Sequence, residues 1–222
     1  WTAQQAGMLM VPSALTTAVM MPIIGMMLQK GVPQQYIAAA GMFLFAIFSF
    51  WGFSILTPDT GSEDFYWMLI VRGCAMGMLF IPITTLALST LKGQEIGQGA
   101  AFTGMTRQLG GSFGIAIITT FLSRQHMVHR SDLVSQLQVS DPAVQQRLHG
   151  MQQVFIAKGM PADMALKASY AGLDRIVTKQ VAVLAYMDVF LYLGILFLIC
   201  VPFVLIVKGN KKKKLDLAKA LH

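Results

Sequence analysis

Five long apolar stretches run through this chain of 222 residues. Each is long enough to cross a bilayer, because a helix needs about 20 predominantly apolar residues to span the hydrocarbon core. A backbone surrounded by lipid must satisfy its own hydrogen bonds, which favours helices for stretches of this kind. We therefore predict an all-α integral membrane protein with spans at residues 6–28, 36–56, 67–91, 99–122 and 181–207.

The scarcity of charged residues supports this class. Only 12% of the residues are charged and 55% are hydrophobic, whereas a soluble domain has about 25% charged residues. The charges are also concentrated in residues 124–179 and 208–219, which leaves few for the apolar stretches. This distribution excludes a free-standing soluble enzyme as the expected class.

The basic residues of the short connections predict the orientation, since Lys and Arg collect on the cytoplasmic side. If the five spans alternate, Lys30, Lys92 and the lysines of the tail (208–222) share one side. The opposite short loop, 57–66, carries three acids and no basic residue. We expect a cytoplasmic C-terminus and an outside start. The tail is expected to meet anionic lipid headgroups rather than nucleic acid.

Residues 123–180 are too polar to cross, and we expect them to form a helical extracytoplasmic loop. Asp141 precedes Pro142, which suits the first position of a helix, while Gly159 and Pro161 predict a break. Apolar residues recur at helical spacing along the segment. Two interpretations remain open for this stripe: a cap that packs on itself or on the outer membrane face, and a docking surface for a partner protein.

Three charged residues lie inside the predicted spans: Arg72, Arg107 and Asp188. Each costs about 2.5–3.5 kcal/mol at the bilayer centre, so each needs a partner or a wet cavity. Arg72 and Asp188 lie at similar depths, which permits either an ion pair that locks two helices or a proton-carrying carboxylate tuned by the arginine. Arg107 has no acid at a matching depth. It either snorkels or lines a cavity beside Gln108, and we take this polar pair as the first candidate site.

Glycine and proline positions inside the spans suit close packing or bending of helices. We expect a role in packing or gating for six of them: Gly73, Gly77, Pro82, Gly110, Gly111 and Gly114.

No sequence pattern indicates catalysis. The chain has no nucleotide-binding loop, no nucleophile elbow and no zinc-spaced set of cysteines and histidines. His126, His129 and His149 have no acid or cysteine clustered with them, so we expect no metal site. Cys74 and Cys200 both fall in apolar stretches, which makes a disulfide improbable. We expect a protein that is not an enzyme and needs no cofactor.

Four segments, in this order along the chain, carry a resemblance to a known family. They are residues 1–7 leading to Pro12, residues 25–30, Arg72-Gly73 running to the Ile81-Pro82-Ile-Thr-Thr-Leu86 stretch, and Arg107-Gln-Leu-Gly-Gly-Ser-Phe-Gly114. With the large outer loop, the chain resembles the C-terminal part of an EmrB/QacA-type drug:proton antiporter of the major facilitator superfamily. These proteins usually have fourteen spans, so the five here would be the tenth to the fourteenth of a longer chain.

The resemblance implies proton-driven export of apolar, often cationic drugs by alternating access in the bacterial inner membrane. It also implies a periplasmic adaptor and an outer-membrane channel as partners. The third and fourth spans would line the cavity or gate it, which supports Arg107 and Gln108, whereas the fifth would be peripheral, which disfavours Asp188 as the proton carrier. In the turn after the first span, Gln29 stands where the family often has an acid.

Two other functions remain open. One is a facilitator of the same fold for a defined solute such as a siderophore, a sugar or an organic acid. The other is a membrane scaffold or receptor domain that does not transport. The five predicted spans leave out half of the expected cavity wall, so we expect no transport from them alone.

Overall fold

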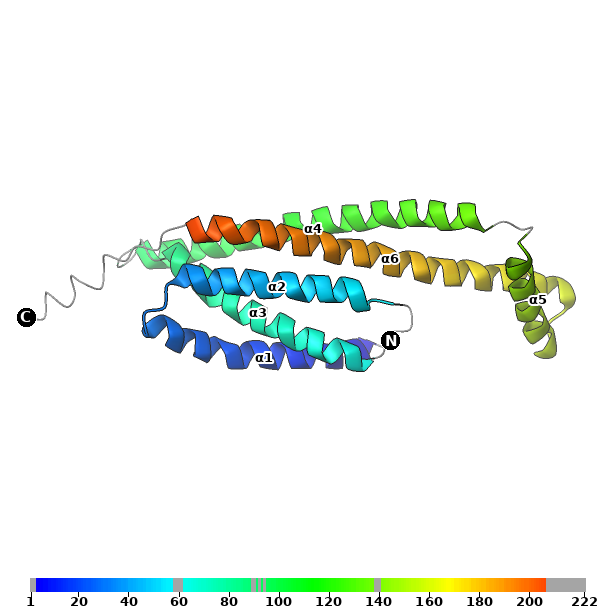
Figure 1. The fold of residues 1–222 in the computed structure, drawn as a ribbon, viewed down its shortest axis with the longest axis horizontal. Helices are drawn as coiled ribbons and strands as arrows, with labels where there is room; N and C mark the ends of the chain where they lie inside the picture. The colour runs from blue at the N-terminus through cyan, green and yellow to red at the C-terminus, as the bar shows by residue number, and fades with distance from the viewer. Residues whose placement is uncertain are drawn as a thin grey trace, which may run out of the picture. The chain divides into compact units, whose positions relative to one another are not determined.

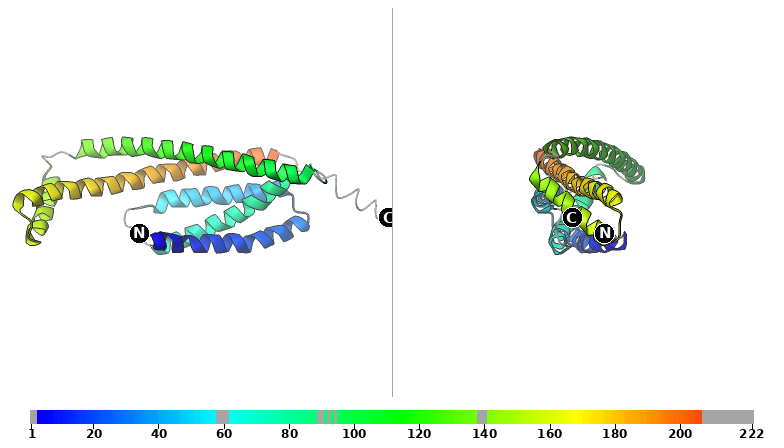
Figure 2. Two further views of the ribbon diagram at one scale, coloured as in Figure 1. Left: turned by 180° about the vertical axis from the view of Figure 1, so that it is seen from behind. Right: turned by 90° about the vertical axis from the view of Figure 1, so that its right-hand side faces the viewer.

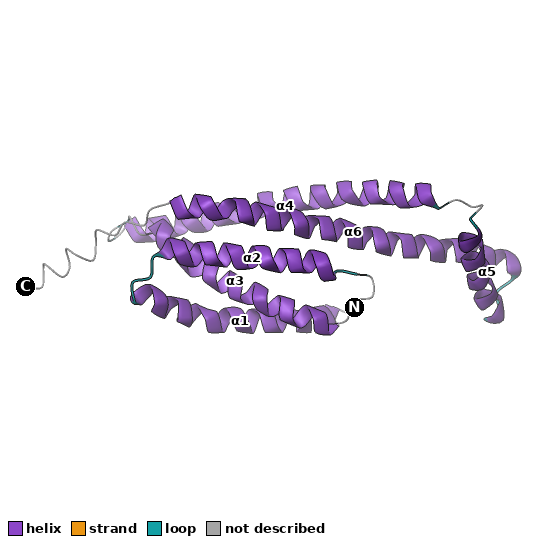
Figure 3. Cartoon of the chain, in the orientation of Figure 1, coloured by secondary structure: helices purple, strands orange, loops and turns teal. Residues whose placement is uncertain are grey.

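The computed structural model describes residues 3–57, 62–88, 91, 93, 95–137 and 141–206. Within these ranges every regular element is a helix, which Figure 3 shows in purple. The helices are labelled in Figure 1: α1 (Ala3–Gln29), α2 (Gln34–Ile55), α3 (Ser62–Leu88), α4 (Glu95–Gln136), α5 (Pro142–Ala157) and α6 (Ala162–Ile206). The predicted all-α fold is confirmed.

The chain divides into two compact units. The first unit contains α1, α2 and α3, the beginning of α4 as far as Ile115, and the end of α6 from Phe190. The second unit is built on residues 116–189, which comprise the rest of α4, all of α5 and the beginning of α6. In this second unit α4 and α6 run side by side, as Figure 1 and the left view of Figure 2 both show.

Four stretches of the described helices are long and apolar enough to cross a membrane: Met10–Gln29, Gln34–Ile55, Phe65–Leu88 and Ala162–Ile206. They contain most of the first, second, third and last predicted spans. The predicted span 99–122 is also helical but is not one of the four, because glycines, hydroxyl side chains, Arg107 and Gln108 lower its hydropathy. A membrane crossing at 99–122 therefore remains a prediction.

The segment 123–180 is helical as expected, but its predicted limits do not coincide with helix ends. Helix α4 continues past residue 122 to Gln136, and α6 begins at Ala162 and enters the predicted last span without a break. The predicted limits of this segment rest on the change in polarity of the sequence at residues 122 and 181. A change of polarity does not interrupt the backbone hydrogen bonds, so the helices continue through it.

Local signals place several helix ends correctly. Asp141 caps α5, because its Oδ1 accepts a hydrogen bond of 2.9 Å from the backbone N–H of Ala143. After α1, Gly31 has a φ of 90°, and after α5, Gly159 has a φ of 89°. Glycine adopts this left-handed conformation without a steric penalty, which is why it terminates helices so often.

Helix α3 packs closely on α1 at two glycines that lie one turn apart. A Cβ atom built on Gly73 would lie 2.5 Å from the carbonyl oxygen of Ser13, and one on Gly77 would lie 2.7 Å from Cβ of Met20. The hydroxyl of Thr17 lies 3.1 Å from the carbonyl oxygen of Gly73 and so also links the two helices. This pattern of small residues with an interhelical hydrogen bond is typical of membrane helix pairs.

The apolar core of the first unit lies where α2 meets α3 and the end of α6. The rings of Phe45 and Phe197 have centroids 4.2 Å apart, and those of Phe48 and Phe190 are 5.8 Å apart in an edge-on arrangement. The buried members of this core are Phe45, Phe48, Met68, Ala75 and Leu79.

Several features that predict the orientation lie outside the described residues. They include Asp59, Lys92 and the basic tail 208–222. The cytoplasmic position of the C-terminus therefore remains a prediction.

We predict that Gly73→Ala destabilises the protein, whereas Gly25→Ala does not. The added methyl group at Gly73 would overlap the carbonyl oxygen of Ser13, and overpacking of this kind costs about 1–3 kcal/mol. Gly25 is a matched control on α1, since no described atom lies within 4 Å of a Cβ built there. The melting temperature of each purified variant checks this prediction, and equal values for the two variants would contradict the close contact.

Candidate functional site

Arg107 lies on α4 with its guanidinium group over the ring of Phe80 from α3. The distance from Cζ of Arg107 to the ring centroid is 5.0 Å. Such a cation–π contact stabilises by about 0.5–1 kcal/mol at exposed sites and by about 2 kcal/mol when desolvated. Among the described residues, the ion pairs do not include Arg107. An aromatic ring, rather than a carboxylate, therefore positions this charge.

Phe80 is held near the proline of α3. Pro82 is fully buried, and like any proline inside a helix it leaves a backbone carbonyl without its usual donor. The hydroxyl of Thr84 donates to the carbonyl oxygen of Phe80 at 2.7 Å, and that of Thr85 donates to Ile81 at 2.8 Å. Both of these carbonyl groups belong to residues that directly precede the proline, so the two hydroxyl bonds reinforce the turn that carries Phe80.

Gln108 and the glycines that follow it lie on an open part of α4. No described atom comes within 4 Å of a Cβ built on Gly110, Gly111 or Gly114. None of the residues of α4 is buried. The close helix contact expected at these glycines is thus not made by any described residue of this chain, and the packing and cavity roles of this face remain predictions.

Arg72 precedes Gly73 on α3 and is half-buried. Arg72 belongs to the first unit and Asp188 to the second, so an ion pair between them remains a prediction. Within the second unit, the described ion pairs join His129 with Asp188 and Arg130 with Asp174.

Asp188 is bound by two side chains of α4 in the second unit. Its Oδ2 accepts a hydrogen bond of 2.6 Å from Nε2 of Gln125 and lies 2.7 Å from Nε2 of His129. Gln125 and His129 are one helical turn apart, so they present their polar atoms to the same point. Within the second unit this carboxylate thus lies against a histidine and an amide.

Sequence reasoning missed Gln125 and His129 as partners of Asp188, and considered His129 only as a metal ligand. It ended the fourth span at residue 122, which placed both partners in a loop. The i, i+4 spacing of Gln125 and His129 places both side chains on one face of a helix. This spacing could have identified them as a pair if the predicted helix had extended beyond residue 122.

Next to this cluster, a second polar contact joins α4 and α6. The guanidinium of Arg130 donates to Oδ1 of Asp174 at 2.7 Å and to the hydroxyl of Thr178 at 3.3 Å. Both side chains of this ion pair are about half exposed, so it contributes little to stability. The ion pair nevertheless joins α4 to α6, the same two helices that the contacts of Asp188 join.

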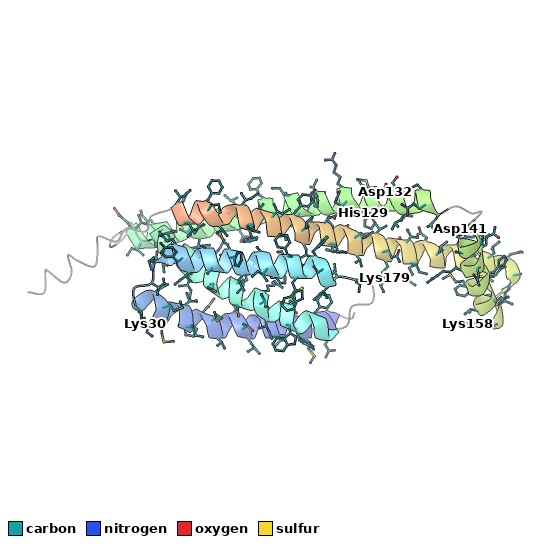
Figure 4. All side chains as sticks on the ribbon, in the orientation of Figure 1. Lys30, His129, Asp132, Asp141, Lys158 and Lys179 are labelled. Carbon is teal, nitrogen blue, oxygen red and sulfur yellow. The ribbon has the colours of Figure 1, made fainter. Side chains whose placement is uncertain are left out.

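A shallow groove of about 470 Å³ runs along α5 and is lined by Arg147, Gly150, Met151, Val154, Phe155 and Lys158. The lining residues recur every three or four positions, so they form one stripe of the helix. Its charged members are both basic, and α5 contains no acidic residue. Figure 4 labels Lys158 just past the end of α5.

The described residues contain no group of three or more His, Cys, Asp or Glu side chains that could hold a metal ion. His129 takes part in the contact with Asp188 instead.

No protein-family model matches the chain. Among curated proteins it is similar to the fatty acid resistance protein FarB of Neisseria gonorrhoeae, with 22% identity over 94% of this chain and 39% of that protein. It is 25% identical to the multidrug export protein EmrB of Escherichia coli K12, over 65% of this chain and 28% of that protein. It is 28% identical to the uncharacterized MFS-type transporter YhcA of Bacillus subtilis, over 64% of this chain and 26% of that protein.

The chain therefore spans less than half the length of these curated relatives. All three are named as resistance, export or transporter proteins, which points away from an enzyme. These similarities confirm the resemblance of the chain to EmrB-type drug transporters of the major facilitator superfamily.

Proposed function

We propose that this chain forms the C-terminal part of a proton-driven multidrug exporter that works by alternating access. The chain would supply one side of a central cavity in a bacterial inner-membrane transporter. The helices of the transporter outside this chain would supply the other side. Inward and outward states would arise from rocking of the two halves of such a protein about the cavity. The similarity to EmrB, which is named a multidrug export protein, supports this function.

The observation that carries the proposal is the exposed arginine on α4. Arg107 is charged and exposed, in a helix whose apolar side chains are also largely exposed. A charge in such surroundings is expected to face a wet cavity, because contact with lipid would be costly. Its stacking on Phe80 offers an aromatic and a cationic group side by side. A cavity with these groups suits apolar substrates and favours the ionised state of any carboxylate that comes near.

The open glycine face of α4 adds to this support. Gly110, Gly111 and Gly114 would allow the backbone of another helix to approach closely. We assign that contact to the half of the transporter outside this chain. The tight pair of α1 and α3, joined at Gly73 and Gly77, would then move as one body when the halves rock.

We predict that Arg107→Ala abolishes ethidium efflux from energised cells that express the intact protein. Arg107→Lys should retain only part of the activity, because an ammonium group keeps the charge but not the planar stacking on Phe80. Arg124→Ala serves as the matched control, since Arg124 is an exposed arginine of the same helix in the segment expected outside the membrane. Efflux is measured by fluorescence at equal expression, with and without a protonophore.

The outcomes of this assay separate the parts of the proposal. Efflux that a protonophore does not reduce would refute proton coupling. Efflux that is unchanged in Arg107→Ala would remove Arg107 from the mechanism while the drug-export function stands. A well-expressed protein that exports no ethidium would favour a facilitator for a defined solute over the drug exporter.

A second candidate function is export of a defined organic acid, in particular a fatty acid. The match to FarB, named a fatty acid resistance protein, extends over 94% of this chain. A guanidinium beside an aromatic ring is also complementary to a carboxylate with an aliphatic tail. If this function is correct, expression should protect cells against long-chain fatty acids and not against ethidium, and Arg107→Ala should remove the protection.

We further propose that the groove on α5 contacts a periplasmic adaptor through an acidic amphipathic helix of that partner. Met151, Val154 and Phe155 offer an apolar surface, and Val154 is 53% exposed. Arg147 and Lys158 lie at its two ends, so carboxylates on the partner would be paired at both ends.

We predict that the double change Arg147→Glu and Lys158→Glu lowers co-purification of the adaptor at least about tenfold, since like charges across an interface cost several kcal/mol. Arg175→Glu is the control, because Arg175 is an exposed basic residue of the same unit outside the groove. Unchanged co-purification and unchanged drug resistance in the double variant would refute the docking surface.

A further inference from the structure

Asp188 is paired with a group whose charge depends on pH. Its Oδ2 lies 2.7 Å from Nε2 of His129 and 2.6 Å from Nε2 of Gln125. A carboxylate in its ionised form can only accept hydrogen bonds, so with that form Nε2 of His129 is the donor of this contact. The side chains of His129 and Asp188 are 24% and 23% exposed, so the pair is largely enclosed but still reached by water.

The identity of the partner changes what the ion pair can do. An arginine, as the sequence suggested, would remain charged at any physiological pH and would form a permanent lock. A histidine changes its charge between pH 5 and 8. When the ring is protonated, the two groups form an ion pair as well as a hydrogen bond, whereas a neutral ring donates a hydrogen bond to the carboxylate without the attraction between opposite charges. The strength of this link between α4 and α6 therefore depends on the proton concentration.

The other charged or titratable groups of this stretch do not replace His129. Arg130 is already paired with Asp174 on α6. His126 lies on the half-buried side of α4, and the described hydrogen bonds do not connect it to Asp188. The titratable or charged groups of the two helix segments are Arg124, His126, His129, Arg130 and Asp132 on α4, and Asp174, Arg175, Lys179, Tyr186 and Asp188 on α6.

We propose that His129 and Asp188 form a proton-binding site that clamps α4 to α6. With both ring nitrogens protonated, the imidazolium and the carboxylate attract each other and the clamp is closed. When the ring is neutral, the hydrogen bond to the carboxylate remains but the attraction between opposite charges is lost, and the two helices separate more readily at this level. The clamp uses none of the residues invoked for drug export and does not require that function.

The orientation predicted from the basic residues places this site near the outer membrane surface. There it would sense the proton concentration outside the cell. Gln125 would hold the carboxylate in place in both protonation states, because its amide donates irrespective of pH.

The distance between two spin labels that flank the site tests the proposal. Met127 on α4 and Tyr186 on α6 are 66% and 50% exposed, so both accept a label without disturbing the core. The labels are attached to cysteines introduced at these positions in the intact protein, with Cys74, Cys200 and any other native cysteine replaced by serine. The protein is held in lipid nanodiscs and measured by pulsed electron paramagnetic resonance.

We predict that the population of the short, narrow distance falls at least about twofold between about pH 5.5 and about pH 8. His129→Gln keeps a donor to Asp188 but cannot titrate, so its distance distribution should be the same at both pH values. Asp188→Asn should also abolish the response and serves as a second test if His129→Gln fails to fold. His126→Gln is the matched control, and it should respond like the parent.

A parent protein whose distances do not change with pH would overturn the proposal, and so would a response that persists in both His129→Gln and Asp188→Asn. The measurement involves no transport. Loss of efflux with an intact pH response would refute the exporter alone, and efflux without a pH response would refute the clamp alone.

Discussion

Polar groups on long apolar helices must find their partners within the protein, and this constraint organises the structure. Several hydroxyl groups meet it locally, by donating to carbonyl groups one turn back on their own helix. Thr16 donates to Pro12 at 2.7 Å, Thr84 to Phe80 at 2.7 Å and Thr103 to Gly99 at 2.8 Å. A hydroxyl group that is bonded to its own backbone costs little in an apolar environment, so these residues are tolerated throughout the helices.

Charged side chains cannot be satisfied in this way, since no group of their own helix neutralises them. Arg107 lies over the ring of Phe80, and Asp188 binds Gln125 and His129. Each of these contacts joins two helices, so each both stabilises a charge and links two elements. A ring and an imidazole are weaker partners than an opposite permanent charge. The resulting links can therefore open at modest cost, as the rocking motion proposed above would require.

Small residues show how far spacing alone predicts packing. Gly73 and Gly77 were expected to allow a close approach, and the structure places Ser13 and Met20 of α1 against them. Gly110, Gly111 and Gly114 have a similar composition and the same expectation, yet no described atom lies within 4 Å of a Cβ built on any of them. A glycine face permits a contact, but a second helix must be present on that side to make it.

The sequence by itself determined the helical class, several helix ends and the resemblance to a transporter family, because hydropathy, caps and breaks act within a few residues. Asp141, Gly31 and Gly159 act where local rules predict. Only the tertiary structure decided which side chains meet. Asp188 binds His129 and Gln125 because α4 continues past the change in polarity at residue 122, which brings these two side chains beside α6. Which side chain meets a charged residue depends on where each helix ends and on how the helix is rotated about its axis. Both are determined by contacts between residues that are far apart in sequence.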